Sequence, residues 1–463
     1  MSERLSSGHA RLDGLLGGGL PPNAINVLIG LPGAGKTILA QQYVFANATP
    51  ERPALYLSTV SEPLEKIIRY AQTLDFFSAQ AVGHAVFYED LGAILNERGL
   101  DAVSERIAEL IRERKPGVIV IDSFKALSAY ADASDFRRFL HELAGRLSAF
   151  PTNCFWVGEY AEDAIADAPE FAVADTIISL SASRTGDRET RTLRVLKMRG
   201  GSAASGAHAY RVTSNGIDVF PRLADPVELD NYVLSDVRIS SGIAALDELL
   251  EEGYWPGAST LCAGPSGAGK TLMGLHFIFN GARDGDPGLI ASLQENPVQL
   301  ERIVRGFGWT LQEPAIELMY RSPVDVYIDE WVYELLETVE RVGARRVLID
   351  SLSDLQIAAA DPVSFREYMY SLSQRLSRQG VSLFMTSELA ELFRVGRLSE
   401  YGVSHLSDNV VLLQYVRDDA VVRRALTVLK TRASHHQPEI REFTITPEGI
   451  VLGGTVAPAQ STG

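Results

Sequence analysis

Two stretches of this chain have the residue types and spacing that bind phosphate groups. The first is Gly30-Leu31-Pro32-Gly33-Ala34-Gly35-Lys36-Thr37, and the second is Gly264-Pro265-Ser266-Gly267-Ala268-Gly269-Lys270-Thr271. In this pattern the glycines let successive backbone N–H groups converge on phosphate oxygens, and a following helix adds the partial positive charge of its N-terminus. One chance match in a chain of 463 residues has odds of roughly one in a hundred, so two are far outside chance.

Each residue type in these loops has a chemical role. Lys36 and Lys270 are expected to reach the β- and γ-phosphates, and the hydroxyls of Thr37 and Thr271 to ligate Mg²⁺. The sequence therefore predicts two nucleotide sites, with ATP and Mg²⁺ as cofactors. The predicted nucleotide-binding residues are Gly30, Pro32, Gly33, Ala34, Gly35, Lys36 and Thr37, and Gly264, Ser266, Gly267, Ala268, Gly269, Lys270 and Thr271.

A nucleotide site of this kind also needs an acid at the end of a neighbouring strand, which holds the Mg²⁺ ion beside the threonine. Asp122 and Asp350 each end an apolar run and are followed by serine, so both are predicted metal-site residues. A third group must act on the attacking water. Glu62 and Glu295 follow the second apolar run of each half and are the predicted catalytic residues, although either could instead stabilise the first turn of a helix.

The elements around these residues repeat along the chain. Gly264 lies 234 residues after Gly30, and Ser240-Ser241-Gly242 lies 234 residues after Ser6-Ser7-Gly8. This offset indicates a duplicated domain, with domains predicted at 1–225 and 226–452 and a disordered tail at 453–463. In the first half we expect strands near 25–29, 54–58, 117–121, 154–158 and 176–180, and helices near 36–47, 63–73, 101–113 and 135–148. Such alternation predicts an α/β fold with a mostly parallel sheet covered by helices, followed in each half by antiparallel strands.

Composition narrows the functional class. The net charge of −16 opposes broad contact with a nucleic-acid backbone. Cys154 and Cys262, the only two cysteines, fall in predicted strands, so we expect buried thiols and a reducing, cytoplasmic compartment. No apolar run approaches the roughly 20 residues that span a bilayer.

These motifs together resemble the KaiC family, the circadian-clock ATPases of the RecA-like superfamily. Further shared features are Gln294-Glu295-Asn296-Pro297, Lys197-Met198-Arg199-Gly200 and the segments 408–416 and 441–446. The resemblance covers about residues 3–452. It implies tandem RecA-like P-loop domains, a homohexameric ring with ATP between subunits, ATP hydrolysis, autophosphorylation in the second domain and a regulatory protein partner.

The resemblance also assigns residues. Lys197, Arg199, Lys430 and Arg432 would form a cationic clamp on the neighbouring subunit's γ-phosphate. Clock members carry two adjacent glutamates and use the first as base, but Ser61 and Gln294 stand at that position here. A glutamine orients water but accepts no proton at neutral pH, so hydrolysis should be slow or depend on the remaining glutamates. Clock members phosphorylate a Ser-Thr pair, and Ser404-His405 leaves Ser404 as the one phosphoacceptor.

Two other functions fit parts of the sequence. RecA-type recombinases and replicative helicases share these loops, although the acidic charge and the lack of a basic segment interleaved with aromatic residues oppose DNA binding. The third interpretation is a nucleotide-bound scaffold that hydrolyses almost nothing.

Overall fold

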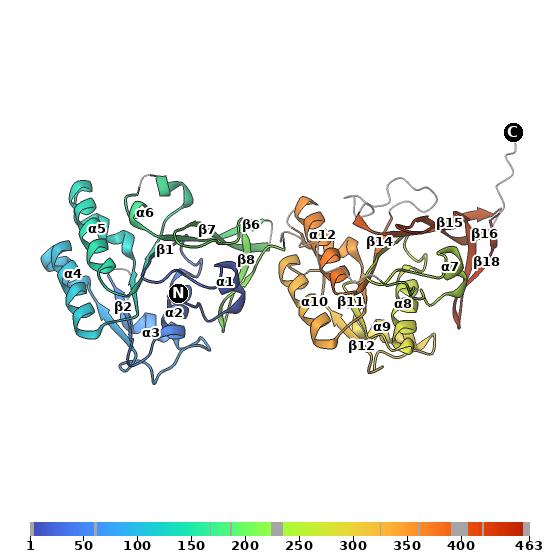
Figure 1. The fold of residues 1–463 in the computed structure, drawn as a ribbon, viewed down its shortest axis with the longest axis horizontal. Helices are drawn as coiled ribbons and strands as arrows, with labels where there is room; N and C mark the ends of the chain where they lie inside the picture. Colours follow the sequence, from blue (N-terminus) through green and yellow to red (C-terminus); the bar gives the residue numbers. More distant parts are fainter. Residues whose placement is uncertain are drawn as a thin grey trace. The chain divides into compact units, whose positions relative to one another are not determined.

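The chain forms two compact units, Met1–Arg222 and Leu223–Gly463, drawn in Figure 1. The structure is a computed structural model, and it describes residues 4–59, 63–166, 168–185, 188–223, 235–324, 326–359, 362–389, 406–418 and 421–456. The predicted domain boundary at 225/226 falls among residues outside this description and stays a prediction.

The first unit alternates strands and helices and then continues in antiparallel strands. Its strands are β1 (Ile25–Ile29), β2 (Ala54–Ser58), β3 (Val86–Asp90), β4 (Val118–Asp122), β5 (Asn153–Gly158), β6 (Thr176–Thr185), β7 (Arg188–Met198), β8 (His208–Thr213) and β9 (Gly216–Phe220). Its helices are α1 (Ala10–Leu15), α2 (Lys36–Asn47), α3 (Leu64–Ala71), α4 (Gly92–Arg114), α5 (Ala133–Ser148) and α6 (Glu170–Val173), with 3₁₀ helices η1 (Phe124–Tyr130) and η2 (Glu162–Ala166).

The second unit repeats this order. Its strands are β10 (Ser259–Gly264), β11 (Gly288–Ser292), β12 (Ile316–Tyr320), β13 (Arg346–Asp350), β14 (Ser382–Glu388), β15 (Asn409–Asp418), β16 (Val421–Lys430), β17 (Arg441–Thr446) and β18 (Gly449–Thr455). Its helices are α7 (Ala244–Leu249), α8 (Lys270–Asp284), α9 (Pro297–Arg305), α10 (Ile328–Val342), α11 (Leu352–Ala358) and α12 (Pro362–Arg378).

Each unit is built on one nine-stranded sheet within the described residues. The strand order is β3-β2-β4-β5-β1-β6-β7-β8-β9 in the first and β12-β11-β13-β14-β10-β15-β16-β17-β18 in the second. Neighbours from β3 to β6 run parallel, and those from β6 to β9 run antiparallel. The predicted fold class is confirmed.

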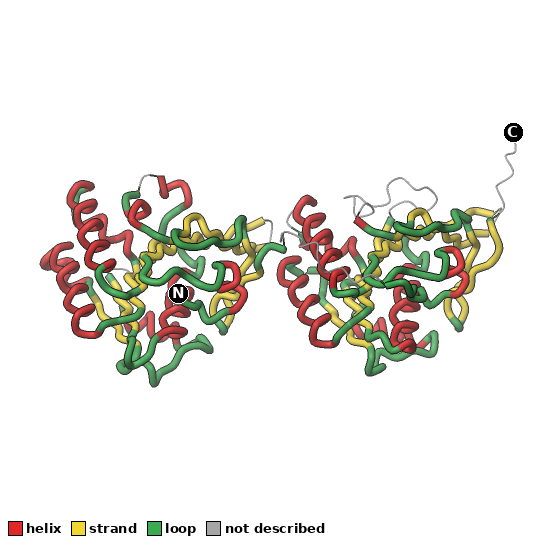
Figure 2. Tube along the Cα trace, viewed as in Figure 1, coloured by secondary structure: helices red, strands yellow, loops and turns green. Residues whose placement is uncertain are grey.

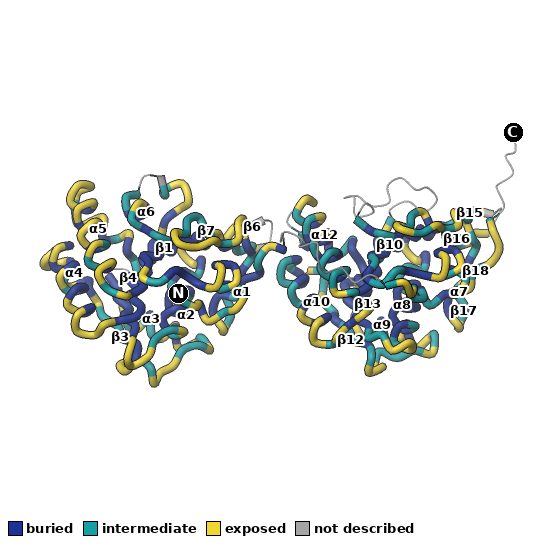
Figure 3. Tube along the Cα trace, in the orientation of Figure 1, coloured by how far each residue is buried: buried dark blue, intermediate teal, exposed yellow. Residues whose placement is uncertain are grey.

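Both faces of each sheet are buried, as parallel sheets require. In the first unit, alternate residues of the central strands enter two separate cores, one shared with α4 and α5 and the other with α1 and α2. The strands of each unit therefore lie between layers of helices (Figure 2), and Figure 3 shows them as its buried centre. Cys154 and Cys262 are buried in β5 and β10.

Three sequence expectations differ from the structure. Strand β3 was not expected, because its sequence Val-Phe-Tyr-Glu-Asp is short and ends in two acids. Helix α4 begins at Gly92 instead of near 101, since it continues across Gly99, whose backbone is not helical. The tail expected at 453–463 begins later, because β18 pairs with β17 as far as Thr455. Residues 457–463 lie outside the described part of the chain.

One buried polar position has been filled differently in the two units. In the first, Asn47 Nδ2 donates to the backbone oxygens of Ser6 and Tyr43, both at 2.8 Å. The equivalent oxygens in the second, of Ser240 and Phe277, accept from Arg346 Nη1 at 2.9 and 3.1 Å. The counterpart of Asn47 is Gly281, whose missing side chain leaves the space that Arg346 occupies.

Among the described helices, none is both long and apolar enough to cross a membrane.

Candidate nucleotide-binding sites

The two phosphate loops join the central strand of each sheet to the helix that follows it. The first connects β1 to α2 and the second connects β10 to α8. A side chain is excluded at Gly30, because a Cβ there would lie 2.1 Å from the backbone oxygen of Leu180. Gly35 and Gly269 precede the helices in left-handed conformations, with φ of 91° and 108°. Both loops thus adopt a backbone that few residues other than glycine tolerate.

The lysines of the two loops make the same local contact. Lys36 Nζ donates to the backbone oxygen of Leu31 at 2.9 Å, and Lys270 Nζ donates to that of Pro265 at 2.9 Å. Each ammonium group is therefore folded over its own loop, where incoming phosphate oxygens can replace the carbonyl. Burial lowers the pKa of Lys36, and the negative charges of Glu159 and then Asp122 partly oppose this.

The threonines and strand-end aspartates meet as the sequence predicts. Thr37 Oγ1 donates to Asp122 Oδ2 at 3.1 Å, and Thr271 Oγ1 donates to Asp350 Oδ2 at 2.8 Å. A second hydroxyl holds each carboxylate, that of Tyr56 on Asp122 and that of Thr386 on Asp350.

Burial raises the pKa of both aspartates, while the hydrogen bonds that they accept and the charge of the loop lysine oppose this rise. A hydroxyl beside a carboxylate is a donor set of hard oxygens that fits Mg²⁺. This ion uses one or two carboxylates and takes its other ligands from water and phosphate.

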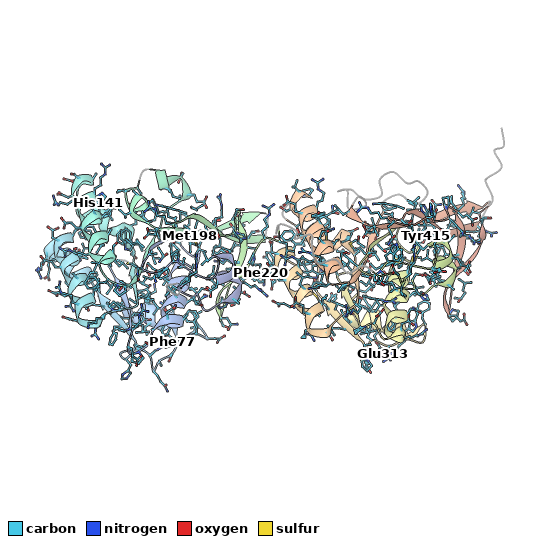
Figure 4. All side chains as sticks on the ribbon, in the orientation of Figure 1. Phe77, His141, Met198, Phe220, Glu313 and Tyr415 are labelled. Atoms are coloured by element: carbon cyan, nitrogen blue, oxygen red, sulfur yellow. The ribbon has the colours of Figure 1, made fainter. Side chains whose placement is uncertain are left out.

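An arginine from the antiparallel part of the sheet contacts each phosphate loop, and sequence analysis missed it. Arg191 Nη1 donates to the backbone oxygen of Gly33 at 2.8 Å, and Arg424 Nε donates to that of Gly267 at 3.4 Å. In the second unit Tyr415, labelled in Figure 4, also donates to the loop, to the oxygen of Ser266 at 3.2 Å. The signal that could have revealed the arginines is their shared place in the repeat, 233 residues apart.

A cavity of about 810 Å³ lies over the first loop. The loop, the ends of β2, β4 and β5, helix η1 and β7 form its walls, and Lys36, Thr37, Asp122, Lys125, Glu159 and Arg191 are among its lining residues. Its size lies in the range of cavities that hold cofactor-sized ligands.

The predicted water-activating residues are only partly described. Glu62 and Ser61 lie outside the described residues, as do Ser404 and His405. In the second unit Gln294 is exposed and Glu295 is partly exposed in the turn between β11 and α9. Ser292 Oγ donates to the backbone oxygen of Glu295 at 2.8 Å, which fixes this turn at the end of its strand.

A family model described as the KaiC ATPase matches residues 5–224 and 239–456. The chain belongs to the KaiC family. It is 28% identical to the circadian clock protein KaiC3 of Synechocystis sp. over 469 residues, which cover 97% of this chain and 92% of that protein. It is 27% identical to the circadian clock oscillator protein KaiC of Picosynechococcus sp. over 458 residues (95% and 88%), and 26% identical to that of Synechococcus elongatus over 454 residues (94% and 86%). The predicted family is confirmed.

In this KaiC-family chain the predicted clamp residues do not meet the phosphate loop of their own unit. The N–H of Arg199 donates to the backbone oxygen of Asp175, whose own N–H donates to Ile25 at the start of β1. The phosphate loop begins beyond the other end of β1, about 13 Å along the strand. Lys197 pairs with Ile177 on the same side of the sheet. Figure 4 labels Met198, which lies between the two clamp residues in the sequence.

The second unit repeats this separation. The N–H of Arg432 donates to the oxygen of Asp408, and the N–H of Asp408 donates to Ser259 at the start of β10. Lys430 Nζ donates to the backbone oxygen of Ser407 at 2.6 Å. The guanidinium groups of Arg199 and Arg432 are 60% and 55% exposed and lie 3.6 and 3.5 Å from the carboxylates of Asp175 and Asp408.

Proposed function

We propose that this protein binds and hydrolyses ATP in both units, as a ring-forming regulatory switch of the kind to which its clock relatives belong. The observation that carries the proposal is the threonine–aspartate hydrogen bond beside each phosphate-loop lysine, made by Thr37 with Asp122 and by Thr271 with Asp350. Membership of a family of ATPases supports the same conclusion. Both units carry the full set of residues, so neither is expected to be a silent copy.

The described residues suit the phosphates of ATP. Lys36 and Lys270 would exchange a carbonyl for phosphate oxygens, and Arg191 and Arg424 hold the loops from the side. Thr37 with Asp122, and Thr271 with Asp350, would hold Mg²⁺, which when bound neutralises charge that develops on the phosphates. The other proposed nucleotide-binding residues contribute backbone N–H groups.

For hydrolysis, Glu62 and Glu295 would act on the attacking water, and Gln294 would help to orient it. Glu62→Gln and Glu295→Gln should each lower turnover more than Ser61→Ala or Gln294→Ala. The reverse order would mean that the two glutamates only stabilise the start of a helix.

Mutation of the loop lysines tests the main proposal. We expect Mg²⁺-dependent phosphate release from the full-length chain, a partial loss in Lys36→Ala and in Lys270→Ala, and complete loss in the double variant. Arg52→Ala is a suitable control, because Arg52 is exposed and far from both loops in the sheet. Phosphate release that persists in the double variant would contradict the proposal.

We propose a homohexamer because Lys197, Arg199, Lys430 and Arg432 are separated from the phosphate loops of their own units by the length of a strand. A neighbouring subunit would supply these cations to each γ-phosphate. A regulatory protein partner, a cytoplasmic location and little affinity for nucleic acid belong to the same proposal.

Autophosphorylation at Ser404 is the narrower part of the proposal. A site of this kind transfers phosphate to any hydroxyl held in line with the γ-phosphate. Intact-mass measurement after incubation with Mg-ATP should show one added phosphate, and that phosphate should be absent from Ser404→Ala and Lys270→Ala. Wild-type protein that releases phosphate without gaining mass would be an ATPase and not a kinase.

A further inference from the structure

A carboxylate that sequence analysis did not single out lies at the first nucleotide site. Glu159 immediately follows β5, and its exposed side chain lines the cavity over the phosphate loop together with Lys36, Thr37 and Asp122. Because β5 lies between β1 and β4 in the sheet, it separates the strand that leads into the phosphate loop from the strand that ends in Asp122.

The strand register puts Glu159 level with the reacting groups. Gly158 pairs with Ile29, the last residue before the loop, and Val157 pairs with Asp122. Glu159 is thus the next residue beyond both pairings, at the edge of the sheet where ligands bind in parallel α/β folds. Its charge acts on Lys36 more strongly than that of Asp122 does.

The backbone at this position is held in both units. Lys125 Nζ donates to the backbone oxygen of Glu159 at 2.8 Å. In the second unit Glu388 occupies the equivalent place, paired with Gly264 at the end of β14, and its N–H donates to Ser353 Oγ at 3.1 Å. The two units thus keep an exposed carboxylate at this edge, although different side chains hold it.

We propose that Glu159, and Glu388 in the second unit, is a catalytic residue that orients the attacking water and accepts its proton. This inference rests on the proposed ATPase function. In the step, the water oxygen forms a bond to the γ-phosphorus and the bond from the γ-phosphorus to the β–γ bridging oxygen breaks. ADP keeps the electron pair of that broken bond. One proton of the water passes to the carboxylate and then to solvent.

This role would explain how hydrolysis proceeds where Ser61 and Gln294 stand in place of a glutamate. Neither side chain accepts a proton at neutral pH, whereas a carboxylate does. Glu159 differs from Asp122 in being exposed to the cavity, while Asp122 is engaged by Thr37 and Tyr56.

The test uses the full-length chain with Lys270→Ala, which silences the second site and leaves the first. Steady-state phosphate release gives kcat and KM, light scattering reports assembly, and thermal melting checks the fold. We expect Glu159→Gln in this background to lower kcat about 100-fold or more, the range of a positioned general base, with KM for Mg-ATP changed less than about threefold. Glu142→Gln, an exposed carboxylate on α5, is the matched control and should leave kcat unchanged.

Each other outcome is decisive. An unchanged kcat in Glu159→Gln would overturn the inference and leave the ATPase proposal standing. A rise in kcat with tighter ATP binding would also overturn it, because the carboxylate would then only repel the γ-phosphate. If the Lys270→Ala parent releases no more phosphate than Lys36→Ala/Lys270→Ala, the proposed function of the first site fails and the inference fails with it. Glu388→Gln in the Lys36→Ala background repeats the test for the second site.

Discussion

Thr37 and Thr271 each use a single hydroxyl for two purposes. In the structure each donates a hydrogen bond to the neighbouring aspartate, and this bond fixes the hydroxyl oxygen next to a buried carboxylate. That carboxylate tolerates burial because a second hydroxyl also donates to it. The pair is therefore organised before any ligand arrives, which reduces the cost of ordering it on binding.

Removing the Thr37 hydroxyl should therefore affect metal use more than folding. We expect Thr37→Val, in the Lys270→Ala background, to raise the Mg²⁺ concentration for half-maximal phosphate release about tenfold, the scale of one lost ligand. Thermal melting should change little, since Asp122 keeps its bonds from Tyr56 and the N–H of Ser123. Thr73→Val, exposed at the end of α3, serves as control. An unchanged Mg²⁺ dependence would remove Thr37 from the proposed metal site.

Sequence patterns reached the residues that lie close together in the chain and missed those that strand order brings together. The phosphate loops were visible because eight consecutive residues carry the pattern. Arg191 and Glu159 were not, because only the order β5-β1-β6-β7 brings their strands to the same loop. The family resemblance supplied Lys197 and Arg199, but it did not reveal that they lie at the opposite end of β1.

At the scale of elements, the last hairpin of the second unit is attached to the helix that follows its phosphate loop. The N–H of Ile450 on β18 donates to Nε2 of His276 on α8 at 3.1 Å. Burial, and after it the positive charge of Arg283, lowers the pKa of His276 to about 4, although a backbone hydrogen bond with Gly242 opposes this. The histidine is thus held in its neutral form, which alone can accept the bond from Ile450.

This attachment predicts a stability that falls in mild acid. The unfolded chain protonates His276 near pH 6.5 and the folded chain only near pH 4, so stability is full above pH 6.5 and is lost as the pH falls between these values. At pH 5 the loss is about 2 kcal/mol.

Denaturant unfolding of the full chain at pH 7 and pH 5 measures the effect. We expect His276→Gln, which keeps an acceptor but does not titrate, to show a smaller pH dependence than the wild type. His84→Gln, at an exposed position in the first unit, should behave like the wild type. Equal pH dependence in all three proteins would show that another group is responsible.

The elements themselves were predicted wherever apolar runs are long and bounded by glycine or proline. Strand β3 and the first turns of α4 were missed for a shared reason. Neighbouring acids and glycines obscure their periodicity, while burial against β2 and α5 decides their structure. The later start of the tail has a similar cause, because the partner strand β17 extends β18 beyond the last apolar residue.

At the scale of the whole molecule, the exposed clamp arginines predict assembly that depends on nucleotide. We expect the wild type to form hexamers with Mg-ATP, and the double variant Arg199→Ala/Arg432→Ala to remain in smaller species under the same conditions. Light scattering after size exclusion measures this. Arg138→Ala, which removes an equally exposed arginine from α5, should assemble normally. Hexamers of undiminished stability in the double variant would contradict the shared-site proposal.

The exchange of Asn47 and Val118 for Gly281 and Arg346 has a consequence for the history of the duplication. Restoring asparagine at Gly281 alone would drive its side chain into Arg346, and restoring valine at Arg346 alone would strip two buried carbonyl groups of their donor. Each reversion on its own should cost about 1–3 kcal/mol, and the two together should cost much less. The two halves are thus separated by a fitness valley. An ancestor in which they were identical crossed it only by an order of changes in which glycine came before arginine.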